Sequence, residues 1–104
     1  MGLTQRLKLH EELCSLLGNR YCYFNPPDNI QLKYPCVIYR RLRPDVKKAD
    51  NKRYTTKDHY RLTVISRDPD YELPDTISDT FPYATIENQA NVNNLSHTYI
   101  DLYY

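Results

Sequence analysis

The sequence contains only two glycines, no tryptophan and no long hydrophobic stretch. So few glycines argue against the glycine-rich loops with which many nucleotide-binding proteins hold phosphate groups. No apolar run approaches the length that spans a bilayer. The N-terminal apolar segment carries acidic and basic residues and lacks a small-residue cleavage site, so we expect no signal peptide and a soluble, intracellular chain.

Residue patterns typical of catalytic or metal-binding sites are also few. The three cysteines, Cys14, Cys22 and Cys36, have no C-x-x-C spacing, which argues against a disulfide framework or a zinc site and predicts reduced, mostly buried thiols. A pair such as Cys36 and His59 could meet across adjacent strands, but chance explains such a pair better than catalysis. We therefore expect no catalytic residues, no metal and no cofactor.

What the chain does contain is tyrosine, of which there are eleven among 104 residues. The length fits one domain, spanning residues 1–104, with its own core. Tyrosine combines a large apolar ring with a polar tip and is frequent both in strands and at wet interfaces. This composition favours a sheet protein with much of its surface committed to partners.

The N-terminal pattern predicts a helix from Thr4 to about Leu17, ended by Gly18. Its apolar residues cover about half of the helix circumference, and Arg6 and His10 fall inside this apolar arc. Two interpretations are open. Either this is an ordinary amphipathic helix with long polar side chains at the edge of the arc, or it faces its own sheet on one side and a neighbouring subunit on the other.

Apolar alternation and turn residues predict five strands and a second, short helix. Residues 34–42 are apolar on both faces, which predicts a central strand covered on both sides. In the last strand, Ile100, Leu102 and Tyr104 belong to the core and Tyr99, Asp101 and Tyr103 face outward. The expected strands are 21–24, 34–42, 58–66, 83–87 and 96–104, with a helix at 75–81 and a polar turn at 88–94.

This order predicts an α+β single domain, in which a largely antiparallel sheet has one long N-terminal helix packed on one face and a short second helix. From Arg43 to Lys57 the hydrophobic period disappears, and a polar loop of that length in a small domain is usually functional.

Charge is segregated along the chain. Residues 40–58 hold eight basic and three acidic residues, whereas residues 67–79 hold one basic and five acidic residues. Three interpretations are open: a solvated surface, head-to-tail assembly of identical copies through opposite charges, or nucleic-acid binding by the basic segment with stacking on Tyr39 and Tyr54. The acidic run lacks the central glycine and terminal glutamate of a calcium loop, so we expect no metal there.

Six segments of the chain resemble small tail-completion proteins of long-tailed bacteriophages, the group that includes tail terminators. These segments are LLG at 16–18, YFNPPDN at 23–29, KYPCVIYRR at 33–41, ADNKRY at 49–54, YRLTVISRDPD at 60–70 and NLSHTYIDLYY at 94–104. The resemblance covers nearly the whole chain in pattern and order, without a catalytic signature. It implies an α+β protein that forms a hexameric ring, caps the tail tube, ends its polymerisation and docks to the neck.

The resemblance also implies which partners the protein has. We expect a structural protein, not an enzyme, that contacts itself, the major tail tube protein and a head-closure or neck protein. It implies no membrane contact and at most transient contact with packaged DNA. The protein would be assembled in the host bacterial cytoplasm and reside in the virion. The alternatives are a head-closure adaptor and a small nucleic-acid-binding module.

The expected interface residues unite the charged segments with the outward tyrosines. The basic segment of one copy would meet the acidic turn of the next. The set is Arg40, Arg41, Arg43, Lys47, Lys48, Lys52, Arg53, Tyr54, Asp68, Asp70, Glu72, Tyr99 and Tyr103.

Overall fold

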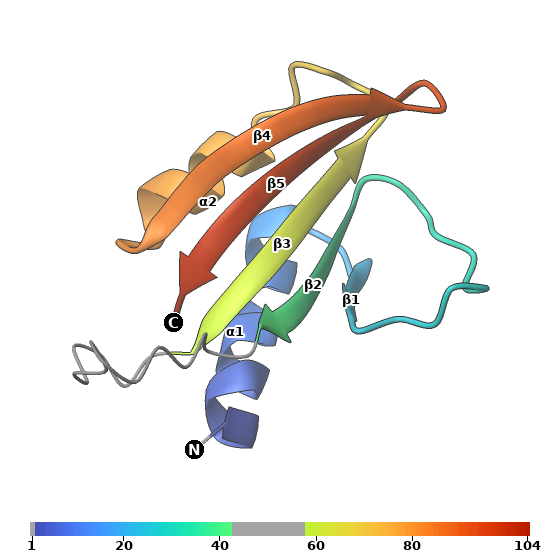
Figure 1. The fold of residues 1–104 in the computed structure, drawn as a ribbon. Coiled ribbons are helices and arrows are strands. Elements are labelled where there is room, and N and C mark those ends of the chain that lie inside the picture. The colour runs from blue at the N-terminus through green and yellow to red at the C-terminus, as the bar shows by residue number, and fades with distance from the viewer. Residues whose placement is uncertain (1, 43–57) are drawn as a thin grey trace, which may run out of the picture.

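The computed structural model describes residues 2–42 and 58–104, and the side chains of the first helix from residue 5 onward. The described residues form two helices and five strands in the expected order (Figure 1). The elements are α1 (Gly2–Leu17), β1 (Cys22–Phe24), β2 (Cys36–Leu42), β3 (His59–Ser66), α2 (Leu73–Thr80), β4 (Ala84–Val92) and β5 (Leu95–Tyr103). None of the helices in these ranges is long and apolar enough to cross a membrane.

The strands form one sheet in the order β1-β2-β3-β5-β4. Only β1 pairs in parallel, with β2, and the remaining pairs in the described ranges are antiparallel. Both helices pack on the same face of this sheet, so the molecule has two layers (Figure 1). The expected fold class, a single α+β domain with a largely antiparallel sheet, is confirmed.

The core lies between the helices and the sheet. From α1 it takes Leu9, Leu13 and Leu17, and from α2 it takes Leu73 and Ile77. Alternate residues of the strands meet them, because successive side chains of a strand point to opposite faces. The sheet side of the core includes Val37, Tyr39, Tyr60, Leu62, Val64, Ile100 and Leu102, each no more than 1% exposed. The predicted core face of the last strand is therefore confirmed at Ile100 and Leu102, and Tyr104, just beyond the end of β5, is partly buried against the same core.

The apolar arc of α1 is broader than its contact with the sheet. Leu7, at the edge of the arc, is 50% exposed. Arg6 and His10 are held against the sheet: the Arg6 guanidinium lies 4.3 Å from the ring centre of Phe24, and His10 Nδ1 lies 2.7 Å from the Tyr39 hydroxyl. The polar residues inside the arc thus contact aromatic side chains of β1 and β2.

The polar turn predicted at 88–94 is wrong. Strand β4 continues to Val92, and the reversal is confined to Asn93 and Asn94, whose φ angles are 53° and 64°. Two consecutive residues with positive φ form the tight hairpin turn that matches strand twist, and asparagine tolerates this conformation. Polar residues suit β4 because it is an edge strand whose side chains are mostly exposed.

The prediction that 34–42 is covered on both sides holds only at the start of the strand, where Cys36 on the face away from the helices is fully buried. Strand β2 has neighbouring strands on both edges, but the helices cover only the face that carries Val37 and Tyr39. On the other face Ile38 is only partly buried. The strand also starts later than predicted, at Cys36, because Pro35 has no N–H for the ladder.

Candidate functional site

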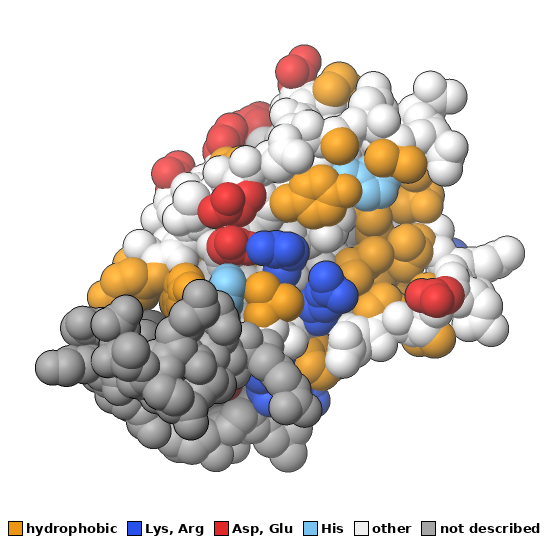
Figure 2. Space-filling model, in the orientation of Figure 1, with side chains coloured by type: hydrophobic (Ala, Val, Ile, Leu, Met, Phe, Trp, Pro, Cys, Tyr) orange, Lys and Arg blue, Asp and Glu red, His pale blue; other side chains and the backbone are white. Residues whose placement is uncertain are grey.

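The face of the sheet that points away from α1 and α2, here called the open face, is the candidate site. Its side chains form rows across the strands: Arg40, Arg61 and Asp101 lie opposite one another in one row, and Ile38, Thr63 and Tyr99 in the next. Figure 2 looks onto this face and shows hydrophobic side chains gathered beside a group of charged ones. The open face thus offers adjacent apolar and charged areas.

The charged area centres on Asp101. Its Oδ1 accepts a hydrogen bond from Arg61 Nε at 3.0 Å, and its Oδ2 lies 3.8 Å from His59 Nε2. This contact with Asp101 raises the pKa of Arg61. His59 in turn stacks on Tyr103, with ring centres 4.4 Å apart and planes 10° from parallel. These side chains form a polar cluster on the open face, in which the buried His59 Nε2 has no hydrogen-bond partner among the described residues.

Arg40 and Arg41, adjacent in sequence, are placed on opposite faces. Arg40 is exposed on the open face and has no hydrogen bond or ion pair with any residue of the described ranges. Arg41 lies on the other face, where its Nη2 donates to the Tyr60 hydroxyl at 3.3 Å and its Nε lies 3.6 Å from Asp58. Of these two adjacent arginines, Arg40 therefore joins Arg61 on the open face and Arg41 does not.

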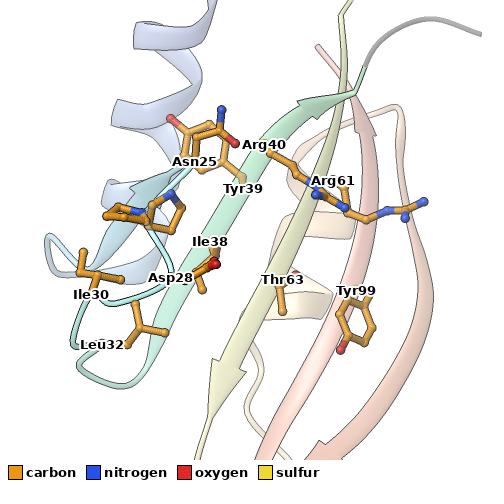
Figure 3. Close-up of a pocket in the computed structure, with 12 residues that line it drawn as sticks. Asn25, Asp28, Ile30, Leu32, Ile38, Tyr39, Arg40, Arg61, Thr63 and Tyr99 are labelled. Atoms are coloured by element: carbon orange, nitrogen blue, oxygen red, sulfur yellow. The ribbon is translucent and has the colours of Figure 1, made fainter.

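A groove of about 490 Å³ runs between the open face and the segment 25–35, which connects β1 to β2. Ile30 and Leu32 line its outer wall, while Ile38, Thr63 and Tyr99 line its floor. Figure 3 shows the wall residues on one side of the groove and the strand residues on the other.

The groove is lined by charges of both signs. Arg40 and Arg61 line one end, with Arg40 extending toward β3 and Arg61 toward β5 (Figure 3). Asp28 lies on the wall formed by the 25–35 segment. The groove therefore combines an apolar floor with the guanidinium of Arg40, which can bind a carboxylate or another anion, while Arg61 at the same end is paired with Asp101.

The acidic turn, residues 67–72, lies between β3 and α2 and is mostly exposed. Its backbone is held by its own side chains: Asp68 N donates to Ser66 Oγ at 3.0 Å, and Asp70 N donates to Asp68 Oδ1 at 2.9 Å. Gln89 Nε2 also donates to the carbonyl of Pro69 at 3.4 Å. Asp68 is thus a structural residue of the turn, whereas the carboxylates of Asp70 and Glu72 point outward without a partner in the described residues.

The predicted interface residues are therefore only partly brought together. Arg40, Tyr99 and Tyr103 share the open face, while the acidic turn follows the opposite end of β3 from Asp58 and the end of β2. Six predicted interface residues lie outside the described ranges: Arg43, Lys47, Lys48, Lys52, Arg53 and Tyr54.

The expectation that the thiols are mostly buried is confirmed, since Cys22 and Cys36 are buried and Cys14 is partly buried. Cys36 and His59 do not meet. Cys36 pairs with Ile65, whereas His59 pairs with Leu42 at the other end of the same two strands. The described residues contain no group of three or more His, Cys, Asp or Glu side chains arranged to hold a metal ion.

Sequence reasoning missed Arg61, Asp101 and the wall residues Ile30 and Leu32. Asp101 was expected to face outward, but only the register of β3 against β5 sets Arg61 opposite it. Ile30 and Leu32 are isolated apolar residues in a proline-rich connection, a pattern that carries no periodic signal.

Comparison with known proteins adds no assignment to this geometry: no family model, no curated protein and no solved structure matches the chain.

Proposed function

We propose that this chain is a structural assembly protein that binds other subunits through the open face of its sheet. The observation that supports this most is the open face itself, which carries tyrosines, an apolar groove and unpaired charge on a sheet whose other face is filled by helices. Exposed aromatic and arginine side chains of this kind are the residues that dominate protein interfaces.

The resemblance to tail-completion proteins supplies the biological setting of the proposal. In that setting the chain forms a ring, expected to be hexameric, at the end of a phage tail tube, ends tube growth and contacts a neck protein. Head-to-tail contacts between identical subunits close into such rings when the rotation between neighbours fits. The segregated charge of the sequence gives each copy the two different surfaces that such a contact requires.

The test is reconstitution with the tail tube protein of the phage that encodes the chain. Purified chain is added to polymerising tube protein, and tube length and tube ends are recorded by electron microscopy. We expect tubes of limited length with a ring at one end. Unchanged tube growth with no bound chain would contradict the tail-terminator role.

Two other results would redirect the assignment. Binding to a neck or portal-side protein without any effect on tube growth would favour a head-closure adaptor. Salt-sensitive binding of a monomer to DNA would favour the nucleic-acid-binding alternative, because phosphate contacts release counterions and weaken steeply with salt.

A further inference from the structure

We propose that the groove on the open face holds the acidic turn of a second copy of this chain. The inference rests on the proposed self-assembly and names the two surfaces that would meet. Of the two surfaces, the groove is concave and lined by Arg40 and Arg61, and the turn is exposed and carries Asp70 and Glu72.

The turn is suited to insertion because its shape is already fixed. Asp68 and Ser66 hold its backbone, Tyr71 N donates to the Asp68 carbonyl at 3.2 Å, and Gln89 holds it from β4. A loop that is ordered before binding loses little conformational entropy when it docks. Asp70 and Glu72 can therefore enter a binding site without reorganisation of the turn.

The groove offers matching chemistry. Arg40 is exposed and has no partner in the described residues, whereas Arg61 beside it is held by Asp101 through Nε. Guanidinium groups bind carboxylates through paired hydrogen bonds, which fix orientation as well as position. Asp28 on the wall faces the same groove, and the turn itself carries a cation, Arg67, ahead of its acids.

The two surfaces cannot satisfy each other within one molecule. Arg61 lies near the start of β3, and the turn follows the end of the same strand, with the groove opening on the face away from the helices. Contact therefore requires a neighbour and uses a different surface on each partner. Repetition of such a contact produces a closed ring or an open helical array.

The test is a charge swap between groove and turn. The association state of each variant in solution is measured by sedimentation over a range of concentrations. Arg40→Glu alters the groove, and Asp70→Arg with Glu72→Arg alters the turn while leaving the structural Asp68 in place. We expect each change to raise the concentration needed for association about tenfold or more, and Arg40→Glu combined with Asp70→Arg in one chain to recover part of the loss.

The matched controls are Lys8→Glu on α1 and Asp79→Arg on α2, which make the same charge changes at exposed helix positions. They are expected to leave association unchanged. Arg40→Ala serves as a second groove variant, and thermal unfolding of each variant establishes that it folds.

Three outcomes would overturn the inference. If the wild type associates and the groove and turn variants associate equally well, the proposed self-assembly stands and this contact is wrong. If the wild type is a monomer at every soluble concentration, both the proposed self-assembly and this contact are wrong. If the variants keep self-association but lose binding to the tail tube protein or to DNA, the groove belongs to that other macromolecule.

Discussion

The buried hydroxyl of Tyr39 lies 2.7 Å from Nδ1 of His10 and so ties the N-terminal helix to the middle of the sheet. Burial raises the pKa of Tyr39 to about 12. Burial, with a smaller contribution from Arg6 and against the opposing effect of Glu11, lowers the pKa of His10. The phenol therefore keeps its proton at neutral pH and can donate it to a neutral imidazole.

This pair predicts that acid destabilises the fold. Because the pKa of His10 is lower in the folded state than its ordinary value of 6.5, the unfolded chain binds a proton more readily. The free energy of unfolding should fall as pH drops below that value, and the fall should end once the folded state is protonated as well. Urea unfolding between about pH 8 and pH 5 measures it.

His10→Gln is the matched variant for this measurement, since it removes the titrating group. Its free energy of unfolding should vary less over the same pH range. An unchanged pH profile would show that His10 does not carry the effect. His10→Leu should in addition cost about 1–3 kcal/mol at neutral pH, because it leaves the buried Tyr39 hydroxyl without its partner.

A second prediction concerns the two faces of β5. Leu102 is fully buried, whereas Tyr99 lies on the open face and is only partly buried. Leu102→Ala should lower the free energy of unfolding by about 2–5 kcal/mol through lost burial and the cavity left behind. Tyr99→Ala should leave the monomer folded and weaken assembly. Equal melting temperatures for wild type and Leu102→Ala would be incompatible with this core.

A third prediction concerns the turn between β4 and β5. Asn94 has a φ of 64°, in the left-handed region that β-branched residues strongly disfavour. Asn94→Val should therefore cost about 1–2 kcal/mol, while Asn94→Gly should preserve or slightly raise stability. Denaturant unfolding of both variants measures the difference, and equal stability of the two would argue against the left-handed turn.

A fourth prediction concerns thiol reactivity. Burial raises the pKa of Cys36 to about 11, and burial next to Cys14 raises the pKa of Cys22 further. Because the thiolate is the reactive form, iodoacetamide should modify the partly exposed Cys14 first and the other two only after unfolding. Mass spectrometry of the native protein over time measures the order. Early modification of Cys22 would show that its burial is wrong.

Most of the fold could be predicted from segments with a strong hydrophobic periodicity. The alternation in the last strand identified its buried face correctly, because apolar side chains at every second position leave only one face for the core. The polar second half of β4, from Asn88 to Val92, had no such signal. Gln89 and Asn91 form a strand because pairing with β5 satisfies their backbone, which is information from tertiary structure.

The candidate site was less accessible to sequence reasoning for a related reason. Outward tyrosines and exposed charges could be named one by one, but the groove depends on where the 25–35 segment lies over the sheet. Strand alternation alone places Arg40 and Arg41 on opposite faces of the sheet. Which of the two lies on the open face can be decided only when the buried face of β2 is known. The strand register and the position of the 25–35 segment bring residues that are distant in sequence together, and neither could be predicted from the sequence.

The parallel pairing of β1 with β2 sets a limit on how this protein can change over evolution or by design. Antiparallel neighbours can be joined by a two-residue turn, but parallel neighbours require a connection that returns along the length of the strand. The 25–35 segment is that connection, and it also forms the wall of the groove. Deletions that shorten it would detach β1 from the sheet. The groove can therefore change its specificity by point substitution but cannot be trimmed away while this topology is kept.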